Sequence, residues 1–323
     1  MERSAVRADA HAGSHHRAIA LPFVARNPLL HPSLGPFTRP FVDLKSFQSS
    51  KQRQICIASS STFSQSYQPD DPTPADGEVV PLRSSVQQSG PYGDFQAFVA
   101  GATGGTGQAI VRRLVAEGVP VRALVRDISR AASLLPPSVE LVKGDVYQFS
   151  TLERALADSN VMFIATGSRP ALDPFGPFNV DYQGVANLVE VGKRAKVKQI
   201  VLVSSIGADE PFFPLNLLWG VLFWKKRGEE ALQRSGLPYT IVRPGGLLDA
   251  PRQGQVPGAI VLEGPGAFGL PPKRTPGSIL RSQVADICVE ALLADSAKNK
   301  VVEAIAEQGQ PARSIRTLFA SVY

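Results

Sequence analysis

The chain has 323 residues, 43% of them hydrophobic, and a formal net charge of +6. This length permits one large domain or two small ones with a substantial core. Eight of the 34 basic side chains but three of the 28 acidic ones lie in residues 1–58, which leaves 26 basic and 25 acidic groups beyond them. This nearly equal number of basic and acidic groups argues against the basic surface of a nucleic-acid-binding protein.

Residues 1–58 are rich in Arg, Ser and Pro, contain few acidic residues and have no continuous apolar segment. This composition is typical of an organelle transit peptide and differs from a secretory signal, although a disordered tail is an alternative. Residues 59–93 are rich in Ser, Gln, Pro and Asp, which predicts a disordered linker. We expect one folded domain over residues 94–323.

The few histidines and cysteines exclude several kinds of site. All four histidines lie in the leader, and Cys288 is the one cysteine beyond residue 58. A disulfide within residues 59–323, a metal site with several His or Cys ligands, and a histidine-dependent triad are therefore excluded. We predict no metal ligands.

From residue 97 onward, short β-branched runs alternate with helical stretches. This alternation predicts an α/β fold, a doubly wound parallel sheet (Rossmann fold) with helices on both faces. One helix is expected to begin with a capping box of Ser150 and Glu153, and another to span residues 179–195. The predicted strands are 97–100, 121–125, 139–142, 161–165, 199–204, 240–242 and 301–306.

A glycine-rich turn follows the first predicted strand. Three glycines occur at i, i+3 and i+6, and a helical pattern that stops at Gly118 follows them at once. Amides at the positive end of such a helix bind a pyrophosphate, which the glycines allow to approach closely. The predicted dinucleotide-binding residues here are Gly101, Ala102, Thr103, Gly104, Gly105, Thr106 and Gly107.

A second glycine string, residues 264–269, matches the G-x-G-x-x-G pattern literally. Prolines follow it at positions 271 and 272, and proline lacks the amide that a helix needs. Because no helix can open there, we expect a loop without a dinucleotide.

Charged residues follow the second predicted strand, where the carboxyl ends of parallel strands form a ligand crevice. Arg126 comes directly after the strand, and Arg130 lies one turn further along. Two cations suit the 2′-phosphate of NADP, whereas Asp127 fits the acid, roughly 20 residues beyond the glycines, that holds the ribose 2′-hydroxyl of NAD. We predict NADP (NADPH) as the cofactor and Asp127 as a helix cap.

Three further strands are followed by candidate cofactor residues: a carboxylate after the third strand, small residues after the fourth and hydroxyls after the fifth. Those after the third strand are predicted to border the adenine, with an aspartate-capped turn as the alternative. The residues after the fourth strand leave room for the nicotinamide ribose. The serines after the fifth strand are expected near the nicotinamide, and an ordinary capping role is the alternative. The residues after the third strand are Asp145 and Val146, those after the fourth are Thr166 and Gly167, and those after the fifth are Ser204 and Ser205.

Together these motifs resemble the atypical short-chain dehydrogenase/reductases, over residues 95–322. Residues 101–107, 125–130 and 144–146 are similar to flavin reductase and biliverdin reductase B-like (NmrA-like) proteins. Other segments are similar to the NADP-binding domain of the redox-sensing component of the chloroplast inner-envelope translocon. They are residues 181–183, 187–189, 202–205, 218–221, 224–225 and 241–246.

The resemblance implies a chloroplast protein with a chloroplast transit peptide and an NADP site. It places Pro244, Gly245 and Gly246 beside the nicotinamide. The translocon component also has a Ser/Pro-rich tail that binds a ferredoxin–NADP reductase. This chain stops at Tyr323, so that partner is not expected.

The family's Tyr-x-x-x-Lys pattern is incomplete. In the family, the lysine holds the nicotinamide ribose and lowers the pKa of the tyrosine. Here Lys225 keeps its place, but Val221 stands where the tyrosine belongs. A positioned acid contributes about 10²–10⁴-fold to rate, so we expect poor carbonyl reduction. The predicted catalytic residues are Lys225 and Ser205, the latter as a substitute proton donor.

Residues 214–224 form the most apolar stretch of the chain and, at 11 residues, are too short to span a membrane. We expect a helix packed on the sheet. A pocket wall for a flat aromatic ligand, and an edge that docks on a membrane or protein, are alternatives.

Two functions remain open at this stage. In the first, the chain is an NADPH-dependent oxidoreductase of the chloroplast stroma whose small-molecule redox acceptor is flat and flavin-like or quinone-like. In the second, it is a catalytically weak NADP(H)-sensing module that regulates or helps assemble a chloroplast membrane complex, in peripheral contact with the thylakoid or envelope. The absent tyrosine favours the second, whereas the intact cofactor motifs suit both.

Overall fold

The structure, a computed structural model, describes residues 90–168, 173–251 and 257–323. The predicted leader, residues 1–58, and nearly all of the predicted linker, residues 59–93, lie outside the described residues. Both therefore stay predictions. The first strand of the fold is β1 (Ala97–Ala100).

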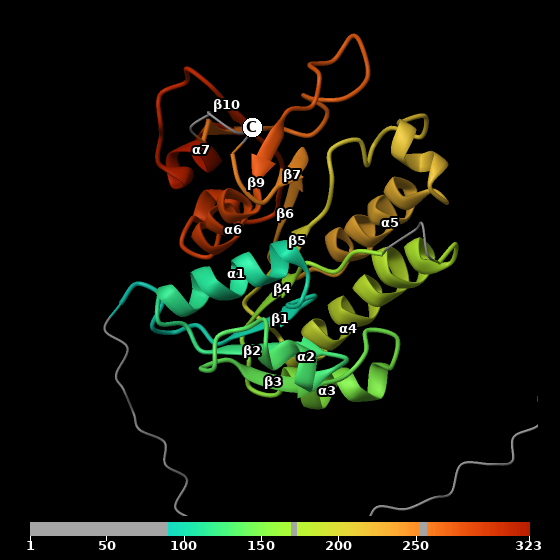
Figure 1. The fold of residues 1–323 in the computed structure, drawn as a ribbon, viewed down its shortest axis with the longest axis vertical. Helices are drawn as coiled ribbons and strands as arrows, with labels where there is room; N and C mark the ends of the chain where they lie inside the picture. The colour runs from blue at the N-terminus through green and yellow to red at the C-terminus, as the bar shows by residue number, and fades with distance from the viewer. Residues whose placement is uncertain (1–89, 169–172, 252–256) are drawn as a thin grey trace, which may run out of the picture. The chain divides into compact units, whose positions relative to one another are not determined.

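An eight-stranded sheet forms the centre of the fold (Figure 1), with the strand order β3-β2-β1-β4-β5-β6-β10-β8. Neighbouring strands run parallel except for β8, which pairs antiparallel with β10. The predicted doubly wound α/β fold is confirmed. Beside β1, the strands are β2 (Val121–Val125), β3 (Glu140–Lys143), β4 (Val161–Ile164), β5 (Gln199–Val203), β6 (Tyr239–Pro244), β8 (Ala259–Glu263) and β10 (Lys300–Glu307).

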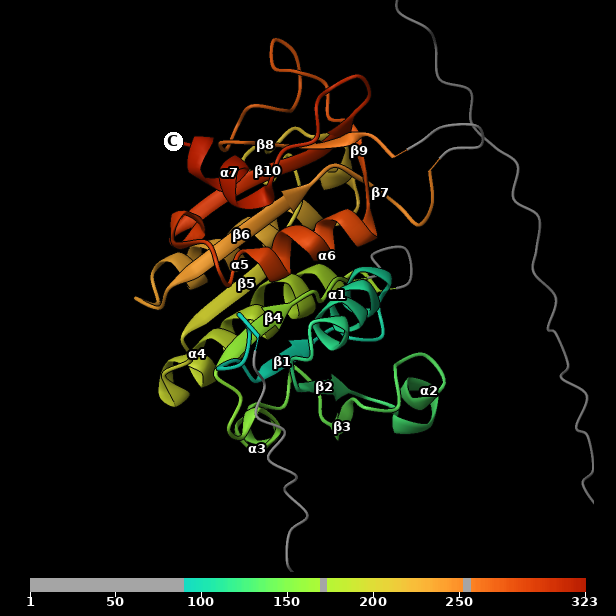
Figure 2. The same cartoon turned by 90° about the vertical axis from the view of Figure 1, so that its left-hand side faces the viewer.

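Helices cover both faces of the sheet (Figure 2). They are α1 (Gly105–Ala116), α2 (Ile128–Ala132), α3 (Phe149–Leu156), α4 (Val185–Ala195), α5 (Val221–Gln233), α6 (Arg281–Glu290) and α7 (Ile315–Ser321). Alternate side chains of a strand point to opposite faces. Val99 of β1 therefore packs in one apolar core with α1 and α6, and Phe98 packs in the other with α3 and α4. Strands buried on both faces are typical of parallel sheets.

The structure contains three strands that the sequence pattern does not predict. One is β8, the antiparallel edge strand of the main sheet. The other two, β7 (Gly246–Leu248) and β9 (Ser278–Leu280), pair with each other in a small second sheet. Strands of three residues are too short to show the alternation by which strands are recognised.

Two helix starts differ from the prediction. The capping box of Ser150 and Glu153 is wrong, because α3 begins at Phe149, whose side chain packs against the core, and no side chain caps the helix. Ser150 therefore lies inside the first turn. The helix predicted for residues 179–195 begins earlier, as the π-helical segment Pro177–Gly184, and continues as α4.

A buried cluster of charged side chains joins β6, α5 and β10. The guanidinium of Arg243, 1% exposed, donates to both carboxylate oxygens of Glu229 at 2.9 and 2.6 Å and lies 3.6 Å from Glu303. It also binds Asp209, which Lys226 contacts at 2.6 Å. Burial raises the pKa of Asp209, but hydrogen bonds and positive charge from Arg243 and Lys226 outweigh burial and lower it to about 2. Asp209 therefore stays ionised far below neutral pH.

Replacing Arg243 with methionine should lower the free energy of unfolding by about 3–5 kcal/mol, because the buried Glu229 carboxylate would lose its counter-ion. Urea denaturation of the full-length protein measures this change. Arg234→Met is the matched control, since its ion pair with Glu230 is solvent-exposed and should contribute about 0–1 kcal/mol. Equal stability of the two variants would contradict the expectation.

Candidate dinucleotide site

The glycine-rich turn between β1 and α1 brings three backbone segments into close contact. Gly101 has a φ of +82°, and a Cβ added there would lie 2.5 Å from the carbonyl oxygen of Ala165, which follows β4. A Cβ on Gly107 would lie 2.1 Å from the carbonyl oxygen of Gly101. A side chain at either glycine would push the turn away from the sheet. Helix α1 begins just inside the turn, at Gly105, with Gly104 as its N-cap.

The first turn of α1 has the properties of an anion site. The first amides of a helix have no intrahelical acceptor, and this turn contains no acidic side chain. The positive end of the helix dipole adds to the attraction for an anion. The turn is therefore of the kind that binds phosphate groups.

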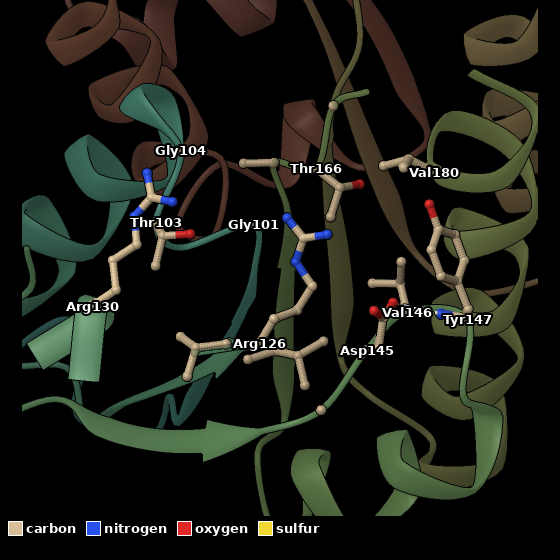
Figure 3. A pocket seen from close by; sticks show the side chains of 15 residues that line it. Gly101, Thr103, Gly104, Arg126, Arg130, Asp145, Val146, Tyr147, Thr166 and Val180 are labelled. Carbon is tan, nitrogen blue, oxygen red and sulfur yellow. Dashed lines mark hydrogen bonds between the residues drawn. The ribbon is translucent and has the colours of Figure 1, made fainter. Parts of the chain in front are cut away.

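A cleft of about 240 Å³ lies beside this turn, at the carboxyl ends of β1, β2, β3 and β4 (Figure 3). The sheet thus brings together residues from four separate strand ends. The predicted cofactor-binding residues that line the cleft are Gly101, Thr103, Gly104, Arg126, Arg130, Asp145, Val146, Thr166 and Gly167.

Two arginines reach the cleft from the end of β2. Arg126 follows the strand and Arg130 lies in α2; both line the cleft, and Figure 3 shows Arg126 directed towards its middle. Neither guanidinium has a hydrogen bond or ion pair with a described residue. Asp127 is the N-cap of α2 and accepts a hydrogen bond from the amide of Arg130 at 3.0 Å. The prediction of Asp127 as a helix cap is confirmed.

Two hydroxyls at the strand ends are buried and unpaired. The Oγ1 of Thr166, after β4, and the Oγ of Ser204, after β5, have no hydrogen-bond partner among the described residues. Buried polar groups in proteins are nearly always hydrogen-bonded. The two hydroxyls are therefore candidates to bind a polar ligand.

The two predicted catalytic residues have partners inside the protein. The Oγ of Ser205 donates to the carbonyl oxygen of Ile206 at 3.0 Å. The Nζ of Lys225 donates to the buried carboxylate of Asp181 at 2.7 Å, and the other oxygen of Asp181 accepts from the amide of Ser168 at 3.3 Å. Neither Ser205 nor Lys225 lines the cleft.

The remaining predicted cofactor residues do not line the cleft either. The segment from Pro244 to Gly246 joins β6 to β7, and a Cβ on Gly245 would lie 2.2 Å from the carbonyl oxygen of Gly277. A backbone contact inside the fold accounts for this glycine without a ligand. The others are Ala102, Gly105, Thr106, Gly107 and Ser204.

Sequence reasoning did not assign several residues of the cleft. The hydroxyl of Tyr147 points towards Val180 in Figure 3, and partial burial together with the charge of Asp145 raises the pKa of Tyr147. Its position directly after the Gly-Asp-Val motif is a usable signal. Val180 lies in the predicted helix 179–195, but the sequence pattern does not predict that this part is π-helical or that it borders the cleft. The other unassigned lining residues are Leu124, Val125, Gly144 and Ala165.

The second glycine string, residues 264–269, forms a loop, as predicted. Its amides are already bound by the protein. Gly266 donates to one carboxylate oxygen of Glu303 at 2.8 Å and Phe268 to the other at 2.9 Å. Because this carboxylate is buried, these amides are closed to an external phosphate.

The apolar stretch 214–224 does not form one helix packed on the sheet. Pro214–Leu217 is a short 3₁₀ helix, and α5 begins at Val221. Val221 and Leu222 are buried, but Leu217 is 88% and Trp219 is 58% exposed. The prediction is therefore right only for the start of α5. No helix in the described part of the chain is long and apolar enough to span a bilayer.

Comparison with known proteins identifies the family. Residues 101–295 match the model of a family described as NAD(P)H-binding. The chain belongs to this family. Its membership of the atypical short-chain dehydrogenase/reductases, expected from the motifs, is confirmed, and its ligand is a nicotinamide dinucleotide.

Three relatives illustrate the range of the family. An uncharacterized chloroplastic protein of Arabidopsis thaliana is 40% identical over 242 residues, which are 70% of this chain and 82% of that protein. The chloroplastic protein TIC 62 of Pisum sativum is 34% identical over 68% of this chain, which spans only 44% of TIC 62. Sanguinarine reductase of Eschscholzia californica is 29% identical over 70% of this chain and 95% of the reductase.

Among solved structures, ChuY, an anaerobillin reductase of Escherichia coli O157:H7, shares the fold with a TM-score of 0.54 and 24% identity, over 67% of this chain and 100% of ChuY. The fit of a dinucleotide to this chain rests on its own geometry. Gly101 and Gly107 leave no room for a Cβ, the first turn of α1 contains no acidic residue, and the hydroxyl of Thr166 is buried without a partner among the described residues.

Replacing Gly107 with alanine should weaken the binding of NADPH and NADH by more than about tenfold, or 1.4 kcal/mol, because the new Cβ would displace the turn. Calorimetric titration measures both dissociation constants, and a thermal melt shows whether the variant is folded. Gly264→Ala is the control, since a Cβ there meets nothing closer than 3.6 Å. Unchanged affinity in Gly107→Ala would contradict the assigned role of the turn.

Proposed function

We propose that the chain is an NADPH-dependent oxidoreductase of the chloroplast stroma that reduces a flat, flavin-like or quinone-like acceptor. The observation that carries this proposal is that two guanidinium groups, those of Arg126 and Arg130, lie beside the glycine-rich turn without a hydrogen bond or ion pair to a described residue. The chloroplastic relatives support the location, as does the predicted transit peptide. A reductase among the relatives supports the class of reaction.

The charges at the end of β2 favour NADP over NAD. A 2′-phosphate between Arg126 and Arg130 would gain charge-assisted hydrogen bonds of about 1.5–3 kcal/mol each. Asp127 is held by the amide of Arg130 as the cap of α2, which leaves it poorly placed to bind a ribose 2′-hydroxyl. Two such bonds correspond to a preference for NADP on the order of 10²–10⁴-fold.

Titration of the full-length protein should therefore show far tighter binding of NADPH than of NADH. Replacing both Arg126 and Arg130 with glutamine should weaken the binding of NADPH and so remove most of this difference. The affinity for NADH should change little, because NADH has no 2′-phosphate for these arginines to contact. Arg112→Gln is the matched control, since Arg112 is exposed on α1 and binds Gln108. Equal affinity of the wild type for both cofactors would overturn the NADP assignment.

The proposed reaction works without a positioned tyrosine. Val221 is the first residue of α5, where the family pattern has its tyrosine, and the missing acid lowers the rate of ordinary carbonyl reduction by about 10²–10⁴-fold. Bound NADPH supplies a hydride, and a flavin-like or quinone-like acceptor can take its proton from water. Lys225, fixed by Asp181, holds the nicotinamide ribose, and Ser205 contacts the acceptor.

A separate observation favours a second function, an NADP(H)-sensing module that regulates or helps assemble a chloroplast membrane complex. Phe212 is 92% exposed and lies in the same stretch of chain as the exposed Leu217 and Trp219. Clustered exposed apolar side chains mark interaction sites in soluble proteins. TIC 62 is among the relatives. In this function the cofactor is bound without being consumed.

A turnover assay separates the two functions. Full-length protein with NADPH and a panel of flavins and quinones should oxidise NADPH if the chain is an enzyme. Lys225→Met should then slow the reaction on the order of tenfold, while Lys225→Arg, which can keep the pair with Asp181, should retain more activity. A rate unaffected by Lys225→Met would contradict its role. Binding without turnover, together with cofactor-dependent release from thylakoid or envelope membranes, would favour the sensing module.

A further inference from the structure

The start of α6 lies over the start of α1. A Cβ added to Gly105, the first residue of α1, would lie 2.8 Å from the Nε and 2.9 Å from the Cδ of Arg281, the first residue of α6. The two helices pack side by side in both views of the fold (Figures 1 and 2). Because Gly105 has no side chain, the guanidinium of Arg281 comes within reach of the N-terminus of α1.

This position is electrostatically unfavourable for a cation unless an anion joins it. The N-terminus of a helix carries partial positive charge, and the first turn of α1 has no acidic side chain. Arg281 contacts one carboxylate, that of Asp249, through Nη1 at 2.8 Å, and the side chain of Asp249 is 85% exposed. Exposed ion pairs contribute little to stability. The other N–H groups of Arg281 have no partner in the part of the chain that the structure describes.

We propose that Arg281 binds the diphosphate of the dinucleotide and so adds a cation to the site besides Arg126, Arg130 and Lys225. The inference rests on the proposed placement of the diphosphate at the first turn of α1. Arg126 and Arg130 face a group that only NADP carries, whereas the diphosphate is common to NAD and NADP. Arg281 therefore sets the affinity for both dinucleotides and leaves the choice between them unchanged. It also couples α6, from the C-terminal part of the fold, to the cofactor.

The test compares three ligands on the full-length protein. Wild type, Arg281→Gln and Arg281→Lys are titrated with NADPH, NADH and 2′-AMP, a fragment that has the 2′-phosphate but no diphosphate. Arg281→Gln should weaken NADPH and NADH by the same factor, on the order of tenfold, and leave 2′-AMP unchanged. Arg281→Lys should recover part of the loss, because lysine keeps the charge but loses the forked geometry.

Two further variants separate binding from a structural role. Asp249→Asn removes the carboxylate and keeps the guanidinium, so it should bind NADPH at least as tightly as the wild type. Arg112→Gln removes a cation from the exposed surface of α1 and should leave all three dissociation constants unchanged. A thermal melt of each variant shows that it is folded.

An unchanged affinity for NADPH in Arg281→Gln, or an equal loss of affinity for 2′-AMP, overturns the proposal. It also fails if Asp249→Asn loses as much affinity as Arg281→Gln, since the ion pair would then order the turn. If the wild type binds NADPH and NADH equally, the NADP preference fails, but a common loss for both in Arg281→Gln still supports the role of Arg281. A wild type that takes up neither dinucleotide overturns both proposals.

Discussion

The site depends on how closely the chain passes itself at the first crossover of the sheet. The backbone of Gly107 lies against Gly101, and Gly101 lies against Ala165. These two contacts set the separation between the N-terminus of α1 and the carboxyl end of β4. The arginines after β2 and the hydroxyl-bearing Thr166 therefore line one cleft beside the first turn of α1. Such preorganisation lowers the free-energy cost of binding.

Charge is used differently in the core and at the cleft. Arg243 is surrounded by carboxylates from α5, β10 and the turn after β5, and this cluster joins β6 to α5 and β10. Arg126 and Arg130 have no such partners among the described residues. Residues 90–323 contain 21 acidic residues for 25 basic ones, and most arginines of the fold could find a carboxylate, so an arginine pair without carboxylates is informative. It supports the proposal that these two side chains bind an anionic group of a ligand.

The fold and the glycine turn could be predicted because their causes are local. Parallel strands are apolar runs buried on both faces, and a turn with no room for a Cβ requires glycine. The capping box at Ser150 failed because burial of Phe149 starts the helix earlier. The pair of Lys225 with Asp181 joins residues 44 positions apart, and no short motif records such a contact. Tyr147 could have been assigned to the cleft, because it directly follows Asp145 and Val146, which are predicted to line it.

Because of Glu303, the second glycine string, unlike the first, has no amides available to an external phosphate at Gly266 and Phe268. The Glu303 carboxylate satisfies the amides of Gly266 and Phe268 and lies close to Arg243. A phosphate could bind these amides only by displacing the Glu303 carboxylate, which has the same sign of charge and belongs to the same chain. At this loop the carboxylate of Glu303 therefore competes intramolecularly with any nucleotide phosphate for the same amides. Of the two glycine strings, the one at residues 101–107 therefore borders an open cleft, whereas the amides of Gly266 and Phe268 in the other are occupied by the protein's own carboxylate.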